Sequence, residues 1–481
     1  AGVNAGNSIA SGGNYNTVVG DEAGTAITTG DKNVFVGTLA GDATTTAGEN
    51  VAIGYDSLGT NILGSGSVAV GPSTLRTQNY GTATNAYNTA VGMFAGYAVT
   101  TGVQNTLIGA FAGDAITTAD ESVAIGYLAL SANTTADDNT AIGSHALTAN
   151  TTGRINTAVG KGSMAANTTG QDNAAFGGLT LDANTTGTGN TALGYATLSS
   201  NTTADNNTAV GYLAGAAVTT GASNTFMGAA SGDAVTTGAQ NTFVGQASGT
   251  AVTTGDNNVA IGYIALASAT TAADNVIVGK QAGFNITDSQ YNVGIGNNAL
   301  QSLTTGDSNV AVGHSTMYGL TTASDNTAVG YNAGVAVTTG TANTLIGTAS
   351  GDAVTTGIRH TALGYGALTT ETTGRAAVAV GYNALATLNV ASNLESYNVA
   401  VGNEAGASMT TGLRNTLIGG LAGDALTDAD DNIAIGQAAL GADTLGSRSV
   451  AVGRAALATQ NFTSATNVFN TAVGYAAGTA I

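Results

Sequence analysis

The sequence predicts an all-β fold, a parallel β-solenoid (β-roll) of about 28 coils with a 17-residue period. Three observations lead to this prediction. A glycine recurs at a fixed interval along nearly the whole chain, and a short phrase of β-branched and aliphatic residues precedes it each time. In addition, 71 of the 481 residues are glycine, and glycine at this frequency destabilises helices.

The repeat can be followed through its recurring glycine. It runs from Gly20 to Gly71, from Gly92 to Gly381 and from Gly402 to Gly453, and it ends at Gly474. Within these runs the interval is 17 residues, whereas the intervals before Gly92, Gly402 and Gly474 are 21 residues. We number the positions of each coil as slots counted from this glycine, which is slot 0.

Slots 13 to 16 are expected to form a short β-strand, as at residues 105–108. Slot 13 is usually Asn, slot 14 is Thr or Val, slot 15 is mostly Ala, and slot 16 is a larger apolar residue. Stacked coils would align the Asn residues in a column. This column predicts either a side-chain amide ladder or a series of turn residues that accept backbone hydrogen bonds.

The remaining slots predict a turn and a weaker strand. Slots 8 to 10 usually read Thr-Thr-Gly, as at residues 100–102, and this glycine suits a turn. Slots 3 to 7, such as residues 95–99, are expected to form the second strand. In most coils one large apolar side chain is present at either slot 4 or slot 7. Gly96 occurs with Val99, whereas Leu147 occurs with Asn150. We therefore expect both slots to face the same point of the interior.

Both faces of the main strand are apolar, although side chains alternate along a strand. We expect slots 14 and 16 to fill the interior and slot 15 to face a neighbouring chain, because a long exposed apolar stripe is unfavourable on a monomer. The alternative is that the small Ala at slot 15 is simply half exposed. The larger slot-15 residues expected to pack between chains are Phe35, Leu107, Phe226, Phe243, Ile277, Leu345 and Leu417.

The phrases at residues 67–71 (SVAVG), 122–126 (SVAIG) and 258–262 (NVAIG) resemble the YadA-like head repeats of trimeric autotransporter adhesins. Similar phrases occur in phage tail fibres. The resemblance extends over nearly the whole chain, although the period here is longer than the usual family repeat. It implies a homotrimeric β-roll that projects from a surface and binds host ligands or other cells.

The array is interpreted as a single domain, residues 1–481, and as a segment of a longer chain. Residues 15–99 align without a gap on residues 397–481, so the end of the chain repeats its beginning. The net charge of −19 argues against nucleic acid as a partner. The absence of cysteine excludes disulfides and thiolate metal sites, and no apolar stretch is long enough to span a membrane. We expect an extracellular location on a cell surface or a virion.

The three 21-residue coils carry insertions that are expected to emerge as loops, where binding residues often lie. These loops are candidate contact sites for a host surface ligand or glycan, and the alternative is that they are bulges that lock the trimer. The candidate residues are Asn79, Tyr80, Tyr87, Asn389, Tyr397, Asn461, Phe462 and Phe469. Tyr also recurs at slot 1, where we expect stacked rings that stabilise the column or, as the less favoured alternative, bind sugars.

No catalytic, cofactor or metal site is expected. Asp42, Asp114, Asp233, Asp352 and Asp424 share slot 5, but not in adjacent coils. The three histidines, His145, His314 and His360, fall in different slots and are expected at the surface. Asn-Thr-Thr matches the N-glycosylation sequon five times, beginning at Asn133, but turn chemistry explains it better.

The leading functional hypothesis is a structural and adhesive extracellular fibre of a bacterium or phage. The alternative is an ice-binding solenoid that uses the Thr columns of slots 8 and 9. Only one of these two columns can face outward from a flat sheet, because adjacent side chains point in opposite directions. An enzyme built on a β-helix would need a charged cluster that interrupts the repeat, and the sequence contains none.

Overall fold

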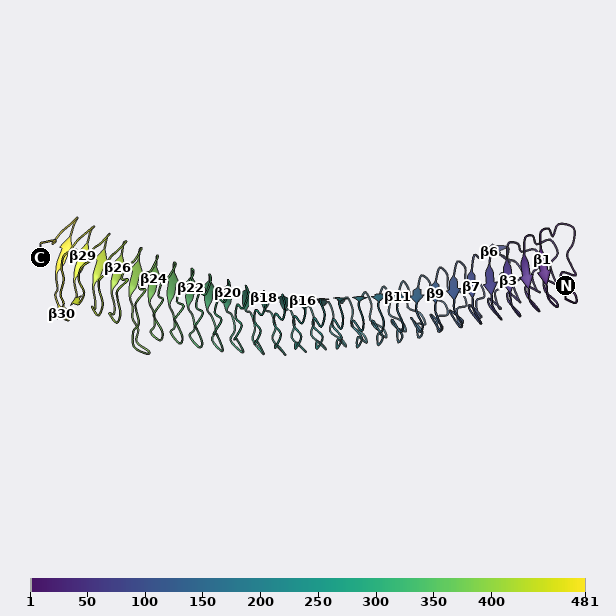
Figure 1. Cartoon of the computed structure of the whole chain (residues 1–481), viewed down its shortest axis with the longest axis horizontal. Coiled ribbons are helices and arrows are strands. Elements are labelled where there is room, and N and C mark those ends of the chain that lie inside the picture. The colour runs from purple at the N-terminus through teal and green to yellow at the C-terminus, as the bar shows by residue number, and fades with distance from the viewer. Residues whose placement is uncertain (1, 481) are drawn as a thin grey trace. The chain divides into compact units, whose positions relative to one another are not determined.

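A computed structural model describes residues 2–480 and divides the chain into two compact units, Ala1–Gln240 and Asn241–Ile481. Within the described residues the chain contains β-strands and no helix. Each unit is a stack of coils in which successive strands lie side by side (Figure 1). Counted over the described residues, 27 coils carry a three-residue strand, so the solenoid has about 27 turns rather than the expected 28.

The strands of the first unit are three residues long, apart from β4 and β6. They are β1 (Thr17–Val19), β2 (Val34–Val36), β3 (Val51–Ile53), β4 (Gly64–Ser65), β5 (Val68–Val70), β6 (Thr84–Asn85), β7 (Thr89–Val91), β8 (Thr106–Ile108), β9 (Val123–Ile125), β10 (Thr140–Ile142), β11 (Thr157–Val159), β12 (Ala174–Phe176), β13 (Thr191–Leu193), β14 (Thr208–Val210) and β15 (Thr225–Met227).

The second unit follows the same pattern, with β28 and β30 as its two-residue strands. Its strands are β16 (Thr242–Val244), β17 (Val259–Ile261), β18 (Val276–Val278), β19 (Val293–Ile295), β20 (Val310–Val312), β21 (Thr327–Val329), β22 (Thr344–Ile346), β23 (Thr361–Leu363), β24 (Val378–Val380), β25 (Val399–Val401), β26 (Thr416–Ile418), β27 (Ile433–Ile435), β28 (Gly446–Ser447), β29 (Val450–Val452), β30 (Thr466–Asn467) and β31 (Thr471–Val473).

The strands pair in parallel with the register that the repeat predicts. Thr140 of β10 pairs with Thr157 of β11, one period later, and the 21-residue coils keep the same slots aligned, as Val68 pairs with Thr89. Backbone hydrogen bonds between coils also continue outside the strands. For example, the Gly96 N–H donates to the Ala112 carbonyl at 2.9 Å. Stacking therefore satisfies backbone groups along most of each coil.

The expected second strand at slots 3 to 7 is wrong, because this segment forms turns in the structure. Slots 2 and 4 adopt positive φ in every complete coil, as in Phe94 at 57° and Gly96 at 58°. A strand requires extended backbone with negative φ, so these two residues prevent one from forming. The positive φ is present whether the residue is Gly or a larger residue such as Leu147.

The slot-0 glycines have a backbone conformation that other residues rarely adopt. Gly92 has φ 133°, and a Cβ atom added to it would lie 2.6 Å from the carbonyl carbon and oxygen of Gly109, the slot-0 residue of the next coil. The same contact recurs between Gly109 and Gly126, at 2.6 Å from the Gly126 oxygen. Glycine is therefore required both by the backbone angle and by the close approach of the next coil.

The slot-13 Asn residues form a buried ladder that combines both sequence-based alternatives. The Asn275 N–H donates to the Asn258 Oδ1 at 3.2 Å, and the Asn275 Nδ2 donates to the same oxygen at 3.1 Å. The Asn275 Nδ2 also donates to the Ser289 carbonyl in the next coil at 2.8 Å. Each amide of this kind is thus hydrogen-bonded both to the side chain of the preceding coil and to the backbone of the next coil.

Serine replaces Asn in the ladder at Ser67, Ser122 and Ser449, and a glutamine from the following inserted segment bridges the interruptions at Ser67 and Ser449. The Gln78 Nε2 donates to the Ser67 Oγ at 3.0 Å, and the Gln78 Oε1 accepts from the Asn88 Nδ2 at 2.9 Å. Gln460 makes the equivalent bonds to Ser449 and Asn470 in the second unit. The ladder therefore continues through two of the three 21-residue coils.

Candidate functional site

The outward face of the solenoid is the reverse of the face expected from the sequence. All seven large slot-15 side chains are fully buried within a single chain, so they cannot pack against a neighbouring chain. These core residues are Phe35, Leu107, Phe226, Phe243, Ile277, Leu345 and Leu417. Slots 14 and 16 point outward instead and are half-buried or exposed.

The burial of slot 15 follows from its fit with slot 4. A Cβ added to Gly96 or Gly113 would lie 2.6 Å or 2.8 Å from a Leu107 methyl group. Likewise, a Cβ at Gly41 would lie 2.6 Å from the Phe35 ring. A large slot-15 residue thus occupies space that glycine leaves empty at slot 4 of the same or the next coil, as close packing requires.

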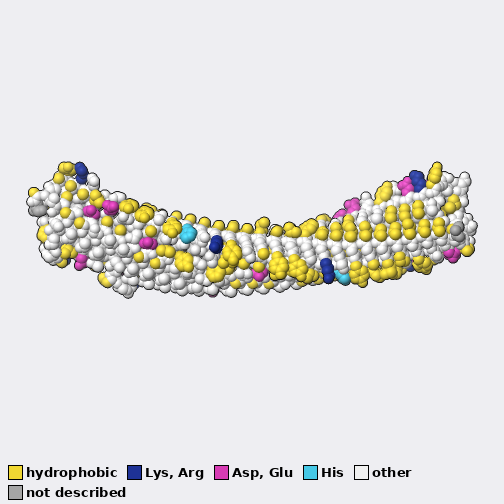
Figure 2. All heavy atoms as spheres, viewed as in Figure 1, with side chains coloured by type: hydrophobic (Ala, Val, Ile, Leu, Met, Phe, Trp, Pro, Cys, Tyr) yellow, Lys and Arg dark blue, Asp and Glu magenta, His cyan; other side chains and the backbone are white. Residues whose placement is uncertain are grey.

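Slots 14 and 16 form two columns of uncharged side chains on the outer surface of each unit. Slot 14 is Thr, Val, Ala or Ile, and slot 16 is Val, Ile, Leu, Met or Phe. Leu193 in slot 16 is 50% exposed, and Phe176 in the preceding coil is 41% exposed. Figure 2 shows apolar side chains in rows that cross successive coils. We call these two columns the apolar strand face: slot 16 is apolar in every coil, and slot 14 is Thr in about half of them.

Buried polar side chains anchor all three 21-residue coils to the coil before them. The Asn61 Oδ1 accepts from the Gly64 N–H at 3.1 Å and from the Gln78 Nε2 at 3.4 Å. Glu371 and Asp443 hold the same slot, slot 7, and accept the backbone N–H of Val390 and of Phe462 respectively. Burial raises the pKa of Glu371, although backbone N–H groups donate to its carboxylate.

The candidate loop residues divide into buried and accessible positions. Tyr80 is only 5% exposed, and its hydroxyl donates to the Gly102 carbonyl at 2.7 Å, so it has a structural role. Phe462 is half-buried. The remaining six, Asn79, Tyr87, Asn389, Tyr397, Asn461 and Phe469, are exposed. In the 21-residue coils the slots after the insertion are counted back from the next slot-0 glycine, so that they match the other coils. Tyr87, Tyr397 and Phe469 then all occupy slot 12, whose side chains lie along one edge of the coils.

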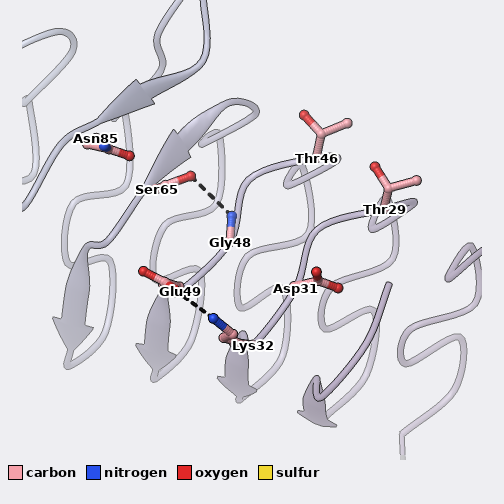
Figure 3. A pocket seen from close by; sticks show the side chains of 8 residues that line it. All are labelled: Thr29, Asp31, Lys32, Thr46, Gly48, Glu49, Ser65 and Asn85. Carbon is pink, nitrogen blue, oxygen red and sulfur yellow. Dashed lines mark hydrogen bonds and ion pairs between the residues drawn. The ribbon is translucent and has the colours of Figure 1, made fainter. Parts of the chain in front are cut away.

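A shallow polar hollow of about 290 Å³ lies on the first unit beside this slot-12 column (Figure 3). Its side chains come from successive coils and from β6. The lining residues are Thr29, Asp31, Lys32, Thr46, Gly48, Glu49, Ser65 and Asn85. A smaller hollow of about 250 Å³ in the second unit is lined by residues of the third inserted segment, among them Asn461 and Phe462.

The slot-1 tyrosines are exposed and stack where they occur in consecutive coils. The ring centroids of Tyr195 and Tyr212 lie 6.0 Å apart, and those of Tyr365 and Tyr382 lie 5.5 Å apart with an angle of 13° between the planes. These contacts agree with a stabilising column. His314 joins the same column by stacking on Tyr331.

His360 is a buried member of the Asn ladder, so the expectation of a surface position was wrong for this histidine. Its N–H donates to the Asn343 Oδ1 at 3.0 Å, and its Nε2 lies 2.8 Å from the Gly374 carbonyl. The Ala377 N–H donates to the Nδ1 at 3.3 Å. The ring thus takes over the acceptor and donor roles of an Asn amide as the neutral Nε2–H tautomer.

The slot-5 aspartates do not assemble a metal site. Asp182 belongs to this set in addition to the five noted from the sequence. One carboxylate oxygen of each of Asp42, Asp114, Asp182 and Asp352 is buried without a hydrogen-bond partner, and burial raises the pKa of all four. Among residues 2–480 no group of three potential ligands is close enough to hold a metal ion.

The five Asn residues of the Asn-Thr-Thr sequences are fully buried. Asn150, Asn167 and Asn184 form a second, shorter ladder in slot 7, with Nδ2 to Oδ1 distances of 2.9 Å and 2.8 Å. Each Nδ2 also donates to the slot-10 carbonyl of its own coil, as in Asn167 to Gly170 at 3.1 Å. Turn chemistry therefore accounts for these sequences.

No protein-family model matches the sequence, and no curated protein matches it either. Within the part of the chain that the structure describes, no helix has the length and apolar character needed to cross a membrane.

The position of His360 predicts a pH-dependent stability of the second unit. Burial lowers its pKa to about 4 from an unfolded value of 6.5, so between these pH values the unfolded chain binds a proton that the folded chain does not. This contribution is complete above pH 6.5 and is lost as the pH falls towards 4. We expect a loss of about 3 kcal/mol in the free energy of unfolding, measured by urea titration at several pH values.

The matched control is His360→Asn, which restores the usual ladder residue. Other titrating groups, including Glu371, are the same in both proteins and cancel in the difference. The variant should lack the part of the pH dependence due to His360. If both proteins lose equal stability between pH 6.5 and 4, the assignment of the neutral histidine to the ladder is wrong.

Proposed function

We propose that this chain forms a structural and adhesive extracellular fibre on a bacterial or phage surface, as a homotrimer and without catalytic activity. The observation that carries the proposal is the apolar strand face of slots 14 and 16. Self-association is the simplest way to shield such a surface from water, because long exposed apolar stripes are unfavourable on monomers.

The size of the apolar strand face supports this assembly. A three-residue strand is about 10 Å long and neighbouring strands are about 4.8 Å apart, so β1 to β15 present a strip of about 600 Å². This area is at the upper limit for a patch on a monomer and near the area that each partner buries in a stable interface.

The charge distribution favours other copies of the chain as the partners that cover this face. Each chain has a net charge of −19, which opposes association, but slots 14 and 16 contain no charged residue in any coil. Identical columns at identical spacing also allow two copies to interdigitate along their whole length. The sequence resemblance to trimeric adhesin heads supports three copies.

Sedimentation equilibrium tests the assembly. We expect a mass three times that of the 46.5 kDa chain, and a monomer for the double variant Val159→Glu and Leu193→Glu, because charges on the apolar strand face would have to be desolvated. The control carries the same two added charges at exposed slot 9 of the same coils, Thr152→Glu and Thr186→Glu, and should remain trimeric. A monomeric wild-type chain at tens of micromolar contradicts the proposal.

Ice binding is a second candidate because one Thr column is fully accessible. Slot 9 is an exposed Thr in nine consecutive coils of the first unit, from Thr101 to Thr237. The slot-8 hydroxyls are engaged instead, as the Thr100 Oγ1 donates to the Thr117 carbonyl at 3.0 Å. One regular column of hydroxyl and methyl groups at a spacing of about 4.8 Å is therefore available to order water.

Thermal hysteresis, measured by nanolitre osmometry, separates the two candidates. The fibre proposal predicts no gap between the melting and freezing temperatures. A gap that disappears in the double variant Thr152→Tyr and Thr169→Tyr would favour ice binding, because both substitutions disrupt the slot-9 column without affecting the apolar strand face.

A further inference from the structure

The polar hollow of the first unit is lined by hydroxyl, carboxylate, ammonium and amide side chains. The hydroxyl-bearing side chains of Thr29 and Thr46 stand at one rim of it, and Asp31 lies below them (Figure 3). The Lys32 Nζ and the Glu49 Oε1 form an ion pair at 3.0 Å, and the Ser65 Oγ accepts the Gly48 N–H at 3.1 Å. Donors and acceptors of several kinds therefore surround one small volume.

In the slot-12 column, two exposed aromatic rings flank the two slot-12 residues that line this hollow, Lys32 and Glu49, and the rings themselves lie outside the lining. From coil to coil the column reads Tyr15, Lys32, Glu49, Gly66 and Tyr87. Tyr15 is 86% exposed and Tyr87 is 56% exposed. A Cβ added to Gly66 would lie 2.9 Å from the Tyr87 ring, so this ring lies against the backbone of Gly66.

The second unit repeats this column with one informative difference. Its slot-12 residues are Tyr397, Arg414, Asp431, Arg448 and Phe469, and Arg414 pairs with Asp431 at 2.6 Å. Arg448 stands where the first unit has Gly66. Its guanidinium carbon lies 5.6 Å from the centre of the Phe469 ring, and its Nε lies 3.6 Å from Asp431. In the second unit a guanidinium therefore lies over the aromatic ring, whereas in the first unit Gly66 places no cation there.

We propose that the polar hollow, flanked by Tyr15 and Tyr87 in the slot-12 column, binds a neutral saccharide. The apolar face of a sugar ring would pack on Tyr87, while the Lys32–Glu49 pair, the threonine hydroxyls and Asn85 would bond its hydroxyl groups. The volume of about 290 Å³ suits one or two sugar rings. The net charge of −19 disfavours anionic ligands. This inference rests on the proposed adhesive function and names the ligand class.

Saturation-transfer difference NMR tests the proposal with four probes: glucose, galactose, mannose and N-acetylglucosamine, each at millimolar concentration. We expect signal transfer to at least one sugar, reduced at least fivefold in Gly66→Arg. The backbone accepts the substitution because Arg448 occupies the equivalent slot with φ 65°, close to the 74° of Gly66, and the Tyr87 ring must shift to admit the new Cβ. Absence of transfer to all four sugars, or equal transfer to the variant, contradicts the proposal.

The reciprocal variant, Arg448→Gly, exposes the Phe469 ring and should increase the transfer to the sugar that the wild type binds. An unchanged signal would contradict the role of the slot-12 aromatic face. The outcome is independent of assembly, because the hollow lies within one chain. If the protein is a monomer that still binds sugar, only the proposed trimer is wrong. If it is a trimer that binds none of the four sugars, only this inference is wrong.

Discussion

The structure depends on the in-register stacking of one coil on the next, and this stacking is closest at the slot-0 glycines. With φ near 133°, Gly92 and Gly109 bring the two backbones so close that no Cβ atom fits between them. Stacking at this distance lets backbone hydrogen bonds continue from the strands into the turns. It also places every slot in a column, so each coil must accept the side chains of the coils before and after it.

Column formation determines which polar residues can be buried. An amide both donates and accepts, so Asn258 and Asn275 can bond each other and the backbone without a net charge. A column of like charges would repel itself at the same spacing. The exception within the ladder follows this rule, since His360 enters it as a neutral ring.

The sequence predicted the period, the strand at slots 13 to 16 and the Asn column, because these depend on repetition alone. It misassigned the strand faces because both are apolar, and only the pairing of Leu107 with Gly96 and Gly113 marks slot 15 as internal. It missed the turn at slots 2 to 4, since a positive φ at Phe94 has no signature in residue type. The slot-12 site was found only in part. Tyr87 was a candidate, but the hollow beside it depends on side chains from several coils.

The most direct test of the account is the free energy of unfolding of Gly92→Ala, measured by urea titration and compared with Gly81→Ala in the preceding 21-residue coil. Gly81 has an ordinary φ and no atom within 4 Å of an added Cβ, so its substitution should change stability by less than about 0.5 kcal/mol. Gly92→Ala should cost at least about 2 kcal/mol, from the positive φ and the clash with Gly109. Equal stability of the two variants would contradict close stacking at slot 0.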